Sequence, residues 1–238
     1  MKSNPSEAKE ISEVALRYER RKLQNIFGRY SPTSMTVTMG RQERERALIH
    51  WMDTSGLLPI GDKSLLEIGC GTGGNLLEML RLGFEPHNLV GNELLQDRSL
   101  IARLRLPAAT QVHIGDALTF DFPTQFDVVF QSTVFTSILD DAFQERLANR
   151  MWELVKPGGQ ILWYDFVYNN PQNKDVRGVP VPRIKKLFPL GQFHFQRVSL
   201  APPIARKLVP IHPILYSVAN MLPLLRTHVL CWIQKPTQ

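Results

Sequence analysis

The sequence has few cysteines and no long uninterrupted apolar run. Its 238 residues include only two cysteines, Cys70 and Cys231, so neither a disulfide framework nor a zinc site built on cysteine pairs is expected. The most apolar stretch, residues 208–233, is broken by three prolines and by arginine and histidine. It therefore lacks the continuity of a membrane-spanning helix. We expect no transmembrane segment and no metal site.

The first ten residues are polar and lack the apolar core of a secretory signal. A cytoplasmic location is therefore the default expectation. The chain is 43% hydrophobic and 21% charged, proportions typical of a folded domain rather than a disordered one. Its net charge is +6. Because the basic residues are spread along the chain, a solvated surface is a simpler interpretation than a nucleic-acid site.

The central part of the chain alternates between two hydrophobic periodicities. Apolar runs at 64–68, 89–91, 110–114, 126–130 and 160–167 predict strands, and amphipathic stretches at 75–82, 94–104 and 141–155 predict helices. Strands that alternate with helices indicate a parallel sheet with right-handed crossovers. Before this region, helices are predicted over 7–27 and 41–52.

The last quarter of the chain has a different pattern. Residues 168–182 are rich in Asn, Pro and Gly, which predicts a long loop near the edge of the sheet. Residues 193–200 and 229–234 predict two antiparallel strands that close the sheet. A small helical insertion is expected between them, at about 201–224.

Glycines follow the first predicted strand. They let the chain turn tightly and let a ligand approach main-chain N–H groups at the start of the next helix. Gly69, Gly71 and Gly74 also satisfy the dinucleotide-binding spacing G-x-G-x-x-G, which is weak evidence alone. Glu67 favours a different ligand, because a carboxylate there suits an ammonium group and would repel a pyrophosphate.

The segment Glu67-x-Gly69-x-Gly71-x-Gly73 resembles the first motif of class I S-adenosylmethionine-dependent methyltransferases. Further segments match that family in order, at 90–93, 115–117, 127–131 and 154–162. The resemblance covers about residues 64–167. It implies an α/β, Rossmann-like, mostly parallel seven-stranded sheet with helices on both faces and an antiparallel last strand. Residues 1–56 would then form an N-terminal helical lid, and residues 57–238 the methyltransferase domain.

The resemblance implies S-adenosylmethionine as the cofactor and suggests residue roles. Glu93, at the end of the second strand, would accept both ribose hydroxyls, which is a bidentate, charge-assisted arrangement. Asp116 would accept the adenine amino group, and the Ala117 N–H would bind the ring. The full set of cofactor-binding residues expected is Glu67, Gly69, Cys70, Gly71, Gly73, Asn75, Glu93, Leu94, Asp116, Ala117 and Gln131.

Methyl transfer from a sulfonium is an in-line displacement, so the protein must align the acceptor and exclude water. A hydroxyl acceptor also needs a proton acceptor. Asp165, near the end of the fifth strand, and Tyr30, on the loop after the first helix, are the catalytic candidates. Thr133, Arg177 and His194 are the substrate candidates, and a guanidinium such as that of Arg177 suits a phosphate or carboxylate.

We therefore expect O-methylation of a small molecule such as a sugar, a glycolipid or a natural product. The loop at 169–178 resembles methyltransferases of bacterial polysaccharide and secondary-metabolite clusters. An RNA or protein methyltransferase and a non-catalytic S-adenosylmethionine-binding scaffold are alternatives. Residues 131–134 lack the Asn/Asp-Pro-Pro-aromatic tetrad of amino-nitrogen methylases, and no nucleic-acid module is visible. Peripheral membrane contact through residues 208–233 is also considered, although an acceptor pocket or a dimer surface explains them more simply.

Overall fold

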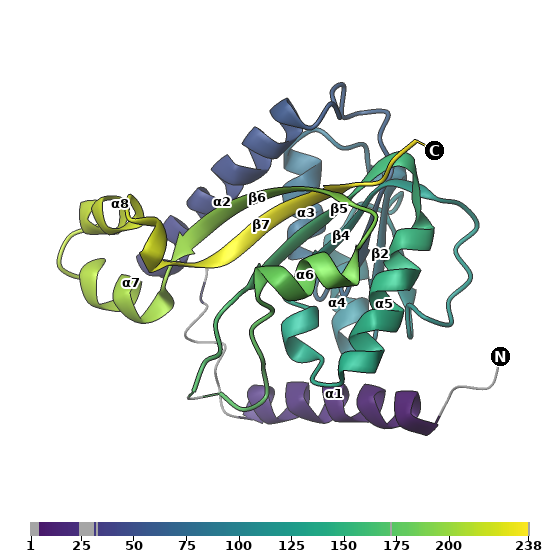
Figure 1. Ribbon diagram of the computed structural model, residues 1–238, viewed down its shortest axis with the longest axis horizontal. Coiled ribbons are helices and arrows are strands. Elements are labelled where there is room, and N and C mark those ends of the chain that lie inside the picture. The colour runs from purple at the N-terminus through teal and green to yellow at the C-terminus, as the bar shows by residue number, and fades with distance from the viewer. Residues whose placement is uncertain (1–4, 24–30, 32, 172, 238) are drawn as a thin grey trace.

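A computed structural model describes residues 5–23, 31, 33–171 and 173–237. Its seven-stranded sheet has the strand order β3-β2-β1-β4-β5-β7-β6 (Figure 1). The strands are β1 (Leu65–Ile68), β2 (Leu89–Glu93), β3 (Gln111–Ile114), β4 (Phe126–Ser132), β5 (Val155–Phe166), β6 (Gln192–Leu200) and β7 (Arg226–Gln234).

The strand directions confirm the fold predicted from the sequence. β1 pairs in parallel with β2 and β4, whereas β7 runs antiparallel to both β5 and β6. The chain passes from β3 at one edge to β4 on the other side of β1. The strand order therefore reverses between β1 and β4, and the carboxyl ends of strands at such a reversal form the usual ligand site of open α/β sheets.

Helices cover both faces of the sheet. They are α1 (Pro5–Leu23), α2 (Met35–Thr54), α3 (Gly74–Arg81), α4 (Gln96–Arg105), α5 (Asp141–Leu154), α6 (Val181–Leu187), α7 (Pro202–Leu208) and α8 (Ile214–Asn220), with short 3-10 turns η2 (Pro86–Asn88), η3 (Phe135–Ser137) and η4 (Pro223–Leu225). Leu65 packs in one core with residues of α2, α3 and α4, and Leu66 packs in another with residues of α5 and α6. Burial on both faces explains the uninterrupted apolar run of β1.

The structure differs from the sequence-based elements at two places. α6 begins at the end of the predicted loop, where two prolines and a length of only seven residues conceal the helical pattern. β5 begins at Val155, before the strand predicted at 160–167, and its register against β4 shifts between Phe126 and Val128. Residues 157–159 are Pro-Gly-Gly, which is typical of a turn, but they form the irregular start of this strand.

The segment between β6 and β7 contains α7, α8 and η4 and stands away from the rest of the molecule (Figure 1). It has a small core of its own, made of Leu200, Ala205, Val209 and Tyr216 and packed against Met39 of α2. Among the described residues, no helix has the length and apolar character needed to cross a membrane.

Candidate active site

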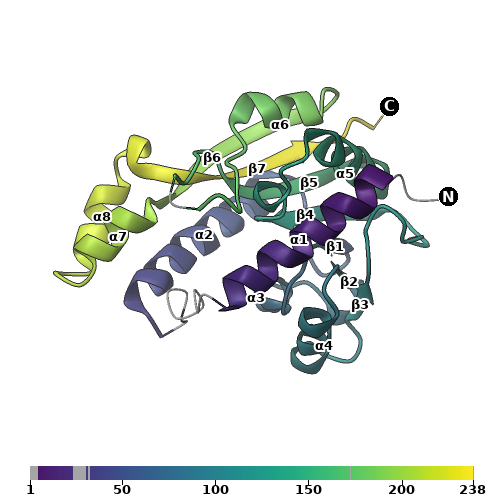
Figure 2. The same ribbon diagram turned by 90° about the horizontal axis from the view of Figure 1, so that it is seen from below.

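A cleft lies at the carboxyl ends of β1, β2 and β3, beside the reversal in strand order. Its walls come from the strand ends, from the segment after β4 and from α5, and α1 lies across it (Figure 2). The lining residues are Ile11, Val14, Tyr18, Ile68, Gly69, Asn92, Glu93, Leu94, Gly115, Asp116, Ala117, Val134, Ser137, Ile138, Phe143 and Leu147. The cavity measures about 80 Å³. That is less than the roughly 300–1,000 Å³ of small-molecule pockets.

The turn after β1 depends on glycine. Gly69, Gly71 and Gly73 have φ values of 69°, 59° and 82°, a region that side chains disfavour. A Cβ at Gly69 would lie 2.6 Å from Cγ2 of Val134, a branched side chain on the cleft wall. The turn therefore keeps its main chain accessible to a ligand at the position where α3 begins.

Glu67, on β1 just before this turn, is fully buried. Its Oε1 accepts a hydrogen bond of 2.6 Å from Asn75 Nδ2, whereas Oε2 has no partner. Burial raises the pKa of Glu67 to about 8, although the Asn75 bond and the charge of Arg44 oppose that shift. A buried carboxylate oxygen without a partner carries a large desolvation cost unless a ligand satisfies it.

Glu93 ends β2, Asp116 follows the end of β3 by two residues, and both line the cleft. The Glu93 oxygens accept hydrogen bonds from the N–H groups of Gly71 (2.7 Å) and Leu95 (2.9 Å). Each carboxylate oxygen accepts two hydrogen bonds, so both retain capacity for ligand hydroxyls. Asp116 Oδ1 accepts from Leu118 N at 3.0 Å. Two carboxylates thus flank the glycine turn along one edge of the sheet.

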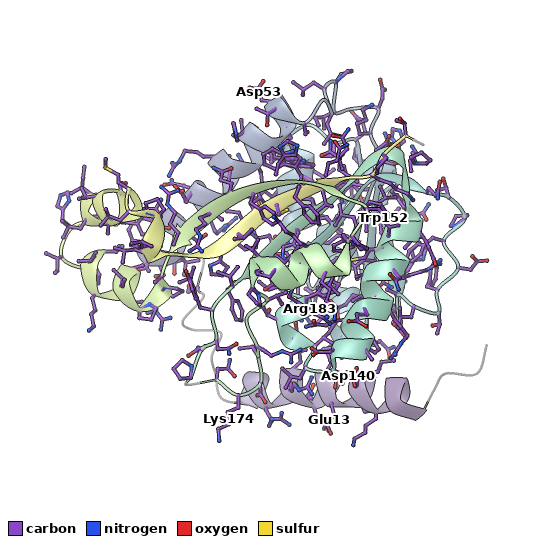
Figure 3. The ribbon with its side chains drawn as sticks, viewed as in Figure 1. Glu13, Asp53, Asp140, Trp152, Lys174 and Arg183 are labelled. Atoms are coloured by element: carbon purple, nitrogen blue, oxygen red, sulfur yellow. The ribbon has the colours of Figure 1, made fainter. Side chains whose placement is uncertain are left out.

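The helix α1 is held over the cleft by a buried ion pair. Arg17 Nη1 lies 2.8 Å from Glu10 Oε1 and also donates to the carbonyl of Ser137 at 3.1 Å. Glu10 Oε1 accepts from Leu139 N at 2.9 Å. Asp140, which caps the start of α5, lies close to α1 (Figure 3). The sequence predicted the helix but not this contact, although a spacing of seven residues places Glu10 and Arg17 on one helical face.

Comparison with known proteins identifies the domain. A family described as "Methyltransferase domain" matches residues 65–159, which contain the glycine turn, Glu93 and Asp116. The chain carries a class I, S-adenosylmethionine-dependent methyltransferase domain. An uncharacterized methyltransferase of Bacillus cereus is 29% identical over 105 residues, which are 44% of this chain and 48% of that protein. The chain thus spans about half the length of the curated relatives it matches.

Two solved structures share the fold of this methyltransferase domain. The N-methyltransferase NodS of Bradyrhizobium japonicum, in complex with S-adenosyl-L-homocysteine, superposes with a TM-score of 0.67 and 14% identity, covering 94% of this chain and 99% of its own. The [4+2]-cyclase SpnF superposes with a TM-score of 0.60 and 18% identity, covering 82% and 81%. Proteins described by different reactions thus share this fold, so the acceptor must be argued from the site.

Six of the residues expected to bind cofactor lie behind the cleft rather than in its lining: Glu67, Cys70, Gly71, Gly73, Asn75 and Gln131. Three of them shape the site through contacts of their own. The Cys70 thiol is buried against Gly91, where an added Cβ would lie 2.8 Å from its Sγ, and burial raises its pKa. Asn75 holds Glu67. Gln131 is buried at the end of β4, and its Oε1 accepts from Val134 N at 3.1 Å.

Asp165 of the methyltransferase domain is fully buried and does not line the cleft. Its oxygens accept from Thr136 N at 3.2 Å and from Phe166 N at 3.0 Å. Burial raises its pKa to about 7, against the opposing effects of these hydrogen bonds.

Thr133, between β4 and η3, has a φ of 58°, a strained conformation that is frequent near functional sites. Tyr30 lies outside the described residues.

The candidate Arg177 and the nearby Arg183 are engaged away from the cleft. Arg177 forms an ion pair with Asp141 at the start of α5. Arg183 donates to Glu145 at 2.8 Å and to the carbonyl of Asp141 (Figure 3). His194, on the edge strand β6, stacks on Trp232 at a centroid distance of 5.2 Å, in a separate surface hollow. The structure therefore does not bring Arg177 and His194 to the cleft.

A polar cluster that sequence reasoning missed lies beside the carboxyl end of β5. Tyr164 Oη is 2.9 Å from Ser199 Oγ, and the Tyr164 ring stacks on His228 at 5.1 Å. Arg44 of α2 lies over the same ring and pairs with Glu78 of α3. Burial lowers the pKa of His228 to about 4, so its ring is neutral at pH 7. No sequence signal joins these residues, since their contact depends on three strands and two helices.

Proposed function

We propose that this protein transfers the methyl group of S-adenosylmethionine to an oxygen of a small-molecule acceptor. The single observation that carries the proposal is the unpaired Glu67 Oε2, buried just before the glycine turn whose Gly71 N–H binds a second carboxylate, Glu93. An amino-acid ammonium group is the ligand that satisfies such an oxygen. The ribose diol would then bind Glu93, and the adenine would bind Asp116 and the Ala117 N–H.

The bound cofactor supplies an electrophilic methyl group, and the chain's own residues bind, orient and exclude water. Ile11 and Val14 of α1 form an apolar cover over the cleft. At the end of β4, the N–H of Thr133 donates to the Tyr164 carbonyl at 2.9 Å and fixes the segment that faces the acceptor. Asp165 acts on this segment through Thr136, so we assign it a positioning role.

Two further solved relatives support a small-molecule acceptor. One is a phosphoethanolamine N-methyltransferase of Haemonchus contortus and another is the magnesium protoporphyrin IX methyltransferase of Synechocystis, with TM-scores of 0.57 and 0.60. Residues 131–134 lack the tetrad of amino-nitrogen methylases, which argues against an RNA or protein acceptor. A sugar, a glycolipid or a natural product fits this description.

The experiment that tests the proposed cofactor is calorimetric titration with S-adenosylhomocysteine, with NAD as a parallel titrant. Micromolar binding of the first and none of the second is the expected outcome, and an acceptor screen with labelled methyl donor would follow. Binding of NAD alone would overturn the proposal, because Gly69, Gly71 and Gly74 would then be a dinucleotide fingerprint.

Replacing Glu93 with glutamine is expected to weaken S-adenosylhomocysteine binding by about 1.5–3 kcal/mol, the scale of hydrogen bonds to charged groups. The amide loses the charge, and its single oxygen cannot serve both Gly71 N and Leu95 N. The same titration measures the loss. Glu85→Gln, an exposed acid just before η2, is the matched control and should bind as the wild type does. Unchanged affinity of Glu93→Gln would remove Glu93 from the ribose site.

Replacing Asp165 with asparagine is expected to leave S-adenosylhomocysteine affinity unchanged and to lower turnover about tenfold or more, since one hydrogen bond to a charged group is worth about 1.5–3 kcal/mol. The two carboxylate oxygens of Asp165 accept from Thr136 N and from Phe166 N. In asparagine one of these oxygens is replaced by an NH2 group, which donates and cannot accept. Initial rates with labelled methyl donor provide the measurement, and Asp121→Asn, at an exposed position, is the control. Full activity would show that Asp165 has no part in the reaction.

A further inference from the structure

The segment between β6 and β7 exposes an apolar surface of its own. Six of its side chains are exposed large hydrophobics, namely Ile211, Ile214, Val218, Met221, Leu222 and Leu224. Met221 is 74% exposed and Leu224 is 86% exposed. Ile214 and Val218 are four residues apart and Met221 lies three further on, so they share one side of α8. Exposed apolar patches of this kind mark interaction sites.

The inner side of this segment is already packed. Leu200, Ala205, Val209 and Tyr216 are buried together, and Leu200 N donates to Tyr216 Oη at 3.3 Å. The exposed side chains therefore do not complete an intramolecular core. They are exposed on a folded unit that stands off the body of the molecule (Figure 1).

The segment that carries this surface has charged side chains of one sign only. After Asp175 the sequence contains no Asp or Glu, and residues 176–238 contain nine Lys or Arg. Arg206 and Lys207 of α7 are exposed, and no acid of the segment itself lies near them. On the neighbouring helix α2, Glu43 forms an ion pair with Arg46 at 3.2 Å. Apolar side chains bordered by cations that pair with no acid among the described residues match an anionic lipid surface. A second copy of the chain would instead bring like charges together.

The segment lies at the same edge of the sheet as the cleft. β6 and β5 run parallel, and the register pairs Phe166 of β5 with His228 of β7, which in turn pairs with Val198 of β6. The segment that follows β6 therefore leaves the sheet at its carboxyl edge, which is the edge that carries the cleft. A flat partner that contacts α8 would lie on this side of the molecule.

We propose that residues 201–226 dock the protein on the surface of an anionic phospholipid bilayer. Ile211, Met221 and Leu224 enter the boundary between headgroups and acyl chains, while Arg206 and Lys207 contact lipid phosphates. The docking is peripheral and does not depend on the proposed methyl transfer, because none of these residues lines the cleft.

The test is flotation of the full chain with vesicles of phosphatidylcholine alone or with added phosphatidylserine. The wild type is expected to float with the anionic vesicles, to float at least tenfold less with the neutral ones, and to dissociate at high salt. Met221→Ser/Leu224→Ser is expected to reduce binding at least tenfold. Leu104→Ser is the matched control, because Leu104 of α4 is also 86% exposed but lies outside the segment. Arg206→Gln/Lys207→Gln is expected to remove the preference for anionic lipid.

Three outcomes would overturn the proposal. The first is no flotation of the wild type with either vesicle, and the second is equal loss in the Leu104 control. The third is a dimer, seen by light scattering without lipid, that Met221→Ser/Leu224→Ser dissociates, because the surface would then join two copies of the chain. Both substituted side chains are exposed, so unchanged thermal midpoints should show that the variants remain folded.

Discussion

Replacing Arg17 with methionine is expected to destabilise the docked position of α1 by about 3–5 kcal/mol, the usual cost of removing one partner of a buried ion pair. Glu10 would remain buried with main-chain donors from Leu139 and Asp140 but no cation, and the Ser137 carbonyl would lose the Arg17 donor. Amide hydrogen exchange along α1 measures the effect. Exchange should become faster across the helix while β1 and β4 stay protected.

Two comparisons make this result specific. Arg46→Met removes an exposed i,i+3 pair with Glu43, so it should cost no more than about 1 kcal/mol. Glu10→Met/Arg17→Met removes both charges and should recover much of the lost protection, since an apolar pair of similar volume is tolerated. If α1 exchanges as slowly in Arg17→Met as in the wild type, the ion pair does not hold the helix.

Low pH should also weaken the docking of α1, because protonation of Glu10 removes its ion pair with Arg17. Burial would raise the pKa of Glu10, but the hydrogen bonds from Arg17 and Leu139 outweigh burial and leave the pKa below its usual 4.5. Ionised Glu10 therefore contributes stability that is present above pH 4.5 and is lost as the pH falls through the lowered value.

The affinity for S-adenosylhomocysteine is expected to rise about tenfold per pH unit between pH 6 and 8 and to level off above, about 2.7 kcal/mol in total. Burial holds the pKa of Glu67 at about 8 in the ligand-free protein, so this carboxyl is mostly protonated at pH 6. An ammonium ligand requires the ionised form, and binding below pH 8 therefore releases a proton. Calorimetry in buffers of different ionisation enthalpy measures that release directly.

Glu67→Gln provides the decisive comparison for this pH effect. The amide cannot ionise, so affinity should be low and nearly independent of pH, whereas Glu85→Gln should retain the wild-type slope. A wild-type affinity that does not change from pH 6 to 8, with no proton released, would show that Glu67 does not meet the ammonium group.

The parts of the site that the sequence predicted are local in the chain. The glycine turn joins β1 to α3 within a few residues, and its positive φ values restrict those positions to glycine. Glu93 ends β2 and Asp116 closely follows β3, and parallel strands bring their carboxyl ends to one edge. The confirmed fold follows from the same alternation of short apolar runs and helices.

The parts that could not be predicted depend on distant segments. Arg177 was expected to meet an anionic acceptor, but it pairs with Asp141, 36 residues earlier in the chain. Arg17 meets the carbonyl of Ser137, which is 120 residues away. A single sequence shows that such groups are charged, but their partners are set by how helices pack on the sheet. For that reason, motif spacing defined the cofactor side of the cleft but not the acceptor side.

The position of α1 has a kinetic consequence. A cavity of about 80 Å³ is too small to admit or release a nucleoside-sized ligand while Ile11, Val14 and Tyr18 remain in place. We therefore expect exchange of spent for fresh cofactor to require α1 to lift, so that the helix would act as a gate. The buried Glu10–Arg17 pair would then set the residence time of the bound product, and weakening the pair would speed turnover whenever release is the slow step.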